Sequence, residues 1–172
     1  MVLTDKNTTL VEAQVLAGAS VVSTNVIDML APGTEWGTGN SFGVLFVITT
    51  TVTGATGATF EIIAASDDAL TTNIAVLGSS GFCPVANLIA AANPQSLAGR
   101  LQVNANPQLI ARLVGPTLGD ESATGYQGVQ RYLGVRVVGT GAFTGGAFTA
   151  TVVEGIAADS TLKNYPSGFI VR

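Results

Sequence analysis

Histidine is absent from this sequence, and cysteine occurs once, as Cys83. Without an imidazole there is no Ser-His-Asp triad, no Cys-His pair and no histidine base. One cysteine and no histidine also provide no zinc site of the ordinary type, and a single thiol cannot form an intrachain disulfide. We therefore expect a protein that is not an enzyme and that holds no cofactor. We expect Cys83 to be a small buried hydrophobic residue.

Glycine is abundant, with 21 residues, but its pattern does not predict a phosphate-binding loop. The stretches GTGNSFG and GTGAFTGG each begin with G-x-G and lack the third glycine at the spacing of a dinucleotide-binding fingerprint. The second stretch leads into an expected strand, whereas a phosphate is held at the start of a helix. A nucleotide cofactor is therefore not expected.

Charged side chains are scarce: they make up 10% of the chain, whereas soluble domains usually carry about 25%. Hydrophobic residues make up 47%, and the mean hydropathy is +0.48. The surface must then be covered by small and uncharged polar residues, or by other protein. We expect the chain to form oligomers or to dock on a larger assembly.

Nucleic acid and membrane are poor partners for this composition. The net charge is −4, and the only lysines, Lys6 and Lys163, lie near opposite ends of the chain. No basic stripe is available to follow a phosphate backbone. The longest apolar run, VLFVI at 44–48, is far shorter than the roughly 20 residues of a spanning helix, and the first residues lack the pattern of an export signal. We expect a protein made in a reducing cytoplasm.

Most of the chain has the pattern of β-strands. Runs rich in β-branched residues and bounded by glycine or turn signals occupy residues 9–18, 20–30, 42–53, 58–65 and 73–80, and two more lie within 131–155. Gly54 and Gly57 predict a hairpin between the third and fourth of these runs. Near the other end, Leu133, Val135 and Val137 are expected on one face of a strand. The pattern predicts a single all-β domain over residues 1–172, a sandwich or barrel.

The middle and the end of the chain are harder to assign. Residues 85–94 fit either a short helix or a buried strand, because periodicity cannot separate the two over so few residues. Residues 100–107 and 109–116 have the pattern of strands stopped by proline. The polar, glycine-containing stretch 117–129 predicts a surface excursion with a role of its own. The tail, residues 156–172, is too apolar for a terminus that makes no contacts, and we expect it to pack on its own domain or on a neighbour.

Asp67 and Asp68 are adjacent carboxylates that follow the expected 58–65 strand. A glycosidase needs two carboxylates roughly 5–10 Å apart, so Glu61 or Asp28 would have to join them. Calcium is a second hypothesis, because Asp side chains and loop carbonyls are hard oxygen ligands, although the spacing lacks the EF-hand pattern. The simplest interpretation is a corner in which Ser66 and Asp67 bond nearby backbone groups.

Trp36 is the only tryptophan and lies between glycine-containing stretches. It fits either a contact residue that stacks on a sugar or anchors a protein interface, or a lid that folds back on the sandwich. Both interpretations remain open.

The collinear order of four segments carries a resemblance. STNVIDM is followed by FGVLFVITTTVTGATGATFEIIAASDDAL, then by RYLGVRVVGTGAFTGGAFTATVVEG and finally by YPSGF. In this order the chain resembles the small capsid cement (decoration) proteins of tailed bacteriophages, over its N-terminal half and last third. Residues 93–129 form a region that is expanded relative to the shorter members.

The resemblance implies an antiparallel jelly-roll sandwich with long loops and an extended C-terminal tail. It also implies a structural virion protein on the outer surface of an HK97-like head, where it bridges and stabilises major capsid subunits. Its partners would be the major capsid protein and other copies of itself, as a dimer or trimer, and the family supplies no catalytic residues. We expect the contacts to come from the termini and the 115–130 excursion, with four aromatic anchors: Trp36, Tyr126, Tyr165 and Phe169. The alternative from another class is a carbohydrate-binding jelly-roll module, calcium-assisted through Asp67 and Asp68.

Overall fold

The computed structural model describes residues 8–28, 42–91, 99–105 and 130–154, and this part of the chain is almost entirely β-structure. Its strands are β1 (Thr9–Val15), β2 (Gly18–Val22), β3 (Ile27–Asp28), β4 (Phe42–Thr53), β5 (Gly57–Ala65), β6 (Ala75–Pro84), β7 (Arg100–Asn104), β8 (Tyr132–Phe143) and β9 (Gly145–Glu154). One 3-10 turn, Val85–Asn87, follows β6. No helix within these ranges is long and apolar enough to cross a membrane.

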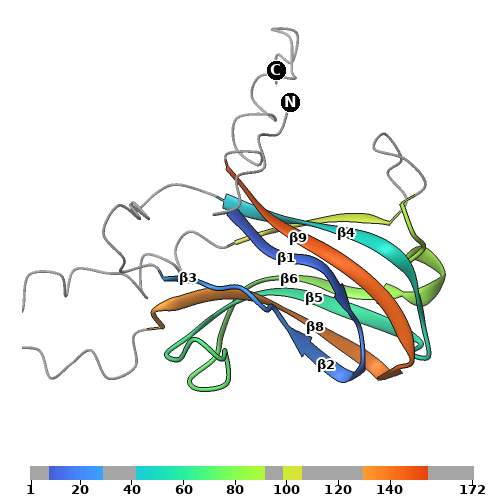
Figure 1. The fold of residues 1–172 in the computed structure, drawn as a ribbon, viewed down its shortest axis with the longest axis horizontal. Coiled ribbons are helices and arrows are strands. Elements are labelled where there is room, and N and C mark those ends of the chain that lie inside the picture. Colours follow the sequence, from blue (N-terminus) through green and yellow to red (C-terminus); the bar gives the residue numbers. More distant parts are fainter. Residues whose placement is uncertain (1–7, 29–41, 92–98, 106–129, 155–172) are drawn as a thin grey trace, which may run out of the picture.

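The strands form two antiparallel sheets that pack face to face (Figure 1). One sheet has the order β1-β9-β4-β7. The other has the order β2-β8-β5-β6, with β3 continuing the β2 side by pairing with β8. The orders β1-β9-β4-β7 and β2-β8-β5-β6, with the chain alternating between the two sheets, are the arrangement of a jelly roll. The sequence-based prediction of an all-β sandwich is confirmed.

Side-chain alternation along the strands builds the core between the sheets, because successive residues of a strand point to opposite faces. The rings of Phe46 in β4 and Phe60 in β5 meet across the two sheets at 5.1 Å between centroids, edge to face. Phe148 in β9 stacks on Phe46 within its own sheet at 6.2 Å. All three are completely buried. Leu133, Val135 and Val137 are also completely buried and share one face of β8, as their pattern predicts.

The predicted hairpin between residues 42–53 and 58–65 is wrong. β4 and β5 lie in different sheets, so Gly54, with φ of +95°, turns the chain from one sheet to the other. β4 pairs instead with β9, and β5 pairs with β8. Both strands have an apolar inward face, and a hairpin would place these faces side by side rather than opposite each other. Crossing between the sheets buries each face against the other.

Two other assignments differ from the expectations. The run at 20–30 is interrupted at Ser23. The N–H of Ser23 still donates to the carbonyl of Val135, but the N–H of Val135 donates to the Ser23 hydroxyl instead of to a backbone carbonyl. Of the 85–94 segment the structure describes residues 85–91, and these form neither a regular helix nor a strand. After the 3-10 turn, the N–H of Val52 donates to the carbonyl of Leu88, and the N–H of Ala91 donates to that of Ile48. This short extended segment therefore lies beside β4.

The two ends of the sandwich differ. At one end, which we call the arch end, three short connections cross between the sheets: Val15 to Gly18, Thr53 to Gly57, and Phe143 to Gly145. At the other, the stem end, lie the start of β1, β4 and β8 and the finish of β3, β7 and β9. The N–H of Asn25 donates to the carbonyl of Leu10 there and ties the sheets together. Figure 1 shows the start of β1 and the finish of β9 on this side.

Candidate functional site

The acidic pair lies in a closed corner at the stem end, between β5 and β6. The carboxylate of Asp67 accepts the N–H of Thr72 at 2.6 Å, the N–H of Thr71 at 3.0 Å and the Thr71 hydroxyl at 2.6 Å. Ser66 donates its N–H and its hydroxyl to the carbonyl of Thr72. These are the local bonds of a turn. The structure thus shows the corner that the sequence suggests.

Because the Thr71 hydroxyl and the N–H groups of Thr72 and Thr71 bond the charged form, the pKa of Asp67 lies below its usual value. Asp68 is exposed. Calcium would have to compete with the corner for the Asp67 oxygens. Among the described residues there is no group of three Asp, Glu, Cys or His side chains that could hold a metal ion. The calcium hypothesis gains no support from this geometry.

The other two carboxylates that a glycosidase would need each form an ion pair with arginine. Glu61 pairs with Arg136, and Asp28 pairs with Arg131 through two bonds of 2.7 and 2.5 Å. The Arg131 guanidinium also lies 5.2 Å from the ring centroid of Tyr132. Each of these carboxylates thus bonds an arginine, whereas the hydrogen bonds of the Asp67 carboxylate go to Thr71 and Thr72.

The four predicted aromatic anchors, Trp36, Tyr126, Tyr165 and Phe169, lie outside the described residues. The strands do show where their segments join the sandwich. Residues 29–41 connect β3 to β4, residues 106–129 follow β7 and precede β8, and residues 155–172 follow β9. Every one of these junctions is at the stem end. The fold therefore brings the roots of three segments, far apart in sequence, to one end of the molecule.

A second candidate surface is the outward side of the β2-β8-β5-β6 sheet. The strand register places its side chains in two adjacent rows: Phe82, Thr59, Val138 and Ser20, then Ser79, Glu61, Arg136 and Val22. We call these eight residues the outer face. Beyond the second row, the corner covers the sheet, since Leu70 packs on Ile63 and Ala65.

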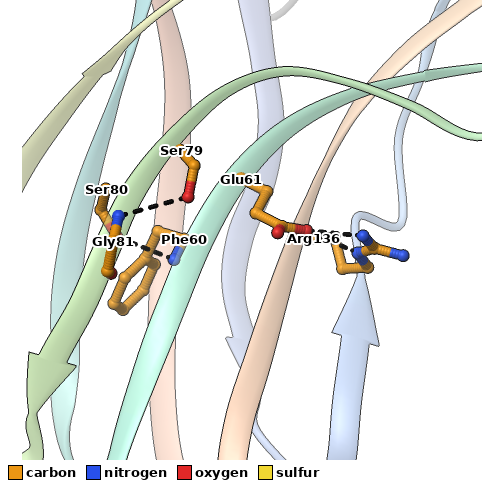
Figure 2. A network of polar contacts seen from close by, with 6 residues as sticks. All are labelled: Phe60, Glu61, Ser79, Ser80, Gly81 and Arg136. Carbon is orange, nitrogen blue, oxygen red and sulfur yellow. Dashed lines mark hydrogen bonds and ion pairs between the residues drawn. The ribbon is translucent and has the colours of Figure 1, made fainter.

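Phe82 is the most prominent apolar side chain of the outer face, with 58% of its surface exposed. Its direction is set by a β-bulge, in which β6 uses one residue more than β5 between the pairs Glu61–Ser79 and Thr59–Phe82. Gly81 adopts φ of +67° in this bulge, and the hydroxyl of Ser80 accepts the N–H of Phe60 at 3.0 Å (Figure 2). The extra residue reverses the alternation, so Phe82 points outward and Cys83 inward, where it packs against the core.

The charges of the outer face neutralise each other. Glu61 and Arg136 lie directly opposite on β5 and β8, and Oε2 of Glu61 accepts from Nε of Arg136 at 2.8 Å and lies 2.7 Å from Nη2 (Figure 2). Their side chains are 15% and 25% exposed. A charge this far removed from water is stable only when paired. The pair therefore presents a polar but neutral centre to anything that contacts the face.

Sequence reasoning missed Phe82 because the preceding GSSG has the composition of a turn, and the expected strand ended at Ser80. The structure continues the strand through the bulge to Pro84. The absence of charge was the available signal: no charged residue occurs between Asp68 and Arg100. An edge strand without a charge is unusual, because charges normally keep such strands from contacting other chains.

Searches against protein-family models and against curated proteins find no match to this chain.

Proposed function

We propose that this protein is a capsid cement, or decoration, protein that binds the outer surface of a phage head and bridges its major capsid subunits. One observation carries the proposal: the segments that contain all four predicted aromatic anchors join the sandwich at the stem end. A rigid sandwich that directs several segments from one end can engage separate subunits at the same time.

The composition supports this function. A chain with 10% charged residues has little to keep an uncovered surface soluble, whereas a surface that is partly covered in an assembly does not need such charges. Many symmetry-related copies on one head would also convert weak single contacts into lasting attachment, because each bound copy stabilises only the assembled state. The proposed location is the virion, with the major capsid protein and further copies of this chain as partners.

The test is a comparison of heads that carry this protein with heads assembled without it. Added area across subunit seams is expected to raise the temperature at which heads open and release DNA, as followed by a DNA-binding dye during heating. Adding the purified protein back to deficient heads should restore the higher temperature. Equal opening temperatures with and without the protein would contradict the proposal.

The alternative, a carbohydrate-binding module, lacks a specific observation in its favour. Its calcium candidates Asp67 and Asp68 lie in a corner whose hydrogen bonds are formed within the chain. We therefore carry the capsid function forward alone.

A further inference from the structure

We propose that the outer face docks on an uncharged surface of a neighbouring capsid subunit, with Phe82 as its apolar anchor and the Glu61–Arg136 pair bonding a peptide or side-chain amide. This inference rests on the proposed function and adds a second contact surface to the stem end. It also specifies the chemistry of the partner surface.

The first support is the position of Phe82. Its ring lies against Gly57, where any Cβ would collide with Cε2 of the ring, so the glycine leaves the space that the ring occupies on β5. Ser80 and Gly81 fix the bulge that turns it outward. A large aromatic ring held rigidly on a surface loses little freedom on binding, and such residues dominate the energy of protein interfaces.

The second support is charge. The two charged residues of the outer face are paired with each other, and its other six residues are uncharged. A charged partner surface would lose its hydration there without gaining an opposite charge. The complementary partner is therefore an uncharged protein surface.

The third support is the set of bonding atoms that the pair leaves open. Only Oε2 of Glu61 and Nε and Nη2 of Arg136 take part in their contacts. Within the described part of the chain, Oε1 of Glu61 and Nη1 of Arg136 bond no other group. Oε1 of Glu61 can accept and Nη1 of Arg136 can donate, and peptide groups or Asn and Gln side chains of an uncharged partner offer an N–H for the one and a C=O for the other.

The fourth support is the separation of the two surfaces. Tyr132 begins β8 at the stem end, and Val138 stands in the Phe82 row. Six residues of strand span about 20 Å. A bridge needs contact surfaces that two subunits can occupy at once, and the stem end and the outer face meet this need.

The experiment measures binding of the full chain to heads assembled without it, by co-sedimentation at increasing protein concentration. Phe82→Ser is expected to weaken binding about 30-fold, the effect of removing one interface anchor of about 2 kcal/mol. Val15→Ser is the matched control, because Val15 is 64% exposed on β1 of the other sheet, and it should change binding less than about twofold. Melting of each free variant confirms that it is folded.

A second pair of variants tests the charge of the partner surface. Thr59→Glu and Thr59→Lys place opposite charges next to Phe82 in the same row, and an uncharged partner predicts that both weaken binding by a similar factor. Binding of the wild type should change less than about threefold between low and high salt, since it neutralises no partner charge. Opposite effects of the two charges, or a tenfold salt dependence, would overturn the assignment of an uncharged partner.

The remaining outcomes separate this inference from the proposed function. If the wild type binds heads and Phe82→Ser binds them equally well, the outer face is not a docking surface and the cement function stands. If Phe82→Ser instead changes the oligomeric state of the free protein in sedimentation, the face binds a second copy and the inference is wrong. Wild-type protein that binds no heads would overturn both.

Discussion

The side chain of Leu70 fills the space that Gly134 leaves beside β8, and the energy of this contact can be measured. We call this space the Gly134 slot. Leu70 is buried with the unusual backbone angle φ of +57°, and it packs beside Ile63 and Ala65. A Cβ on residue 134 would collide with Cδ1 of Leu70 and lie 2.7 Å from Oγ of Ser23. The glycine thus provides the space in which the corner loop is anchored on the sheet.

The expected cost of Gly134→Ala follows from these contacts. Overpacking a filled site usually costs about 1–3 kcal/mol, and replacing glycine returns roughly 0.4–1 kcal/mol by restricting the unfolded chain. We therefore expect a net loss of about 1–2 kcal/mol in the free energy of unfolding. Leu70→Ala should cost about 2–4 kcal/mol, because it empties the slot.

The double variant is the decisive measurement. With Leu70 shortened, the new methyl group at 134 no longer collides with Cδ1 of Leu70, so Gly134→Ala should cost about 1 kcal/mol less in that background. Urea unfolding of the four proteins, followed by circular dichroism, gives the free energies from the midpoints and slopes. If the two substitutions change the free energy of unfolding additively, within about 0.4 kcal/mol, then residues 70 and 134 do not interact and the reasoning is refuted.

Three further results are expected from the same assay. Asp67→Asn should be less stable than the wild type at neutral pH. Because the folded-state pKa of Asp67 is depressed, the wild-type advantage is complete above the unfolded value and should vanish as pH falls below about 4 through the folded pKa. Asp68→Asn, at the exposed neighbouring carboxylate, is the matched control. Ser80→Ala removes the acceptor of the buried Phe60 N–H and should cost about 1–3 kcal/mol, so an unchanged midpoint would contradict the role of the bulge hydroxyl. Arg131→Gln breaks a partly exposed ion pair and should lower the urea midpoint only slightly, a difference that high salt removes; a large or salt-insensitive loss would be inconsistent with this.

The successful strand predictions depend only on residues that are close together in the sequence. Residues 42–53 match β4 as expected, because a long β-branched run between turn signals needs no distant information. The burial of Leu133, Val135 and Val137 follows from simple alternation. The failed hairpin shows the limit: alternation says which side chains point inward, but it does not say which strand lies beside which.

The candidate sites divide in the same way. The corner at Asp67 could be predicted because its hydrogen bonds join residues only four or five positions apart. The outer face could not, because Glu61 and Arg136 are 75 positions apart, and Phe82 depends on a bulge inside a stretch that resembles a turn. Only the register of β5 with both neighbours brings these residues together.

The sequence alone therefore determined the composition of the surface and the identity of the inward side chains, since both depend on residue type and on the period of a strand. It left the neighbours of each strand undecided. The tertiary structure decided those, placing β9 beside β4 and β8 beside β5, because burying two apolar faces against each other is favourable only when the chain crosses between sheets. That choice also gathered the segment roots at the stem end and exposed Phe82 in the row next to a neutral ion pair, the two features on which the functional proposals rest.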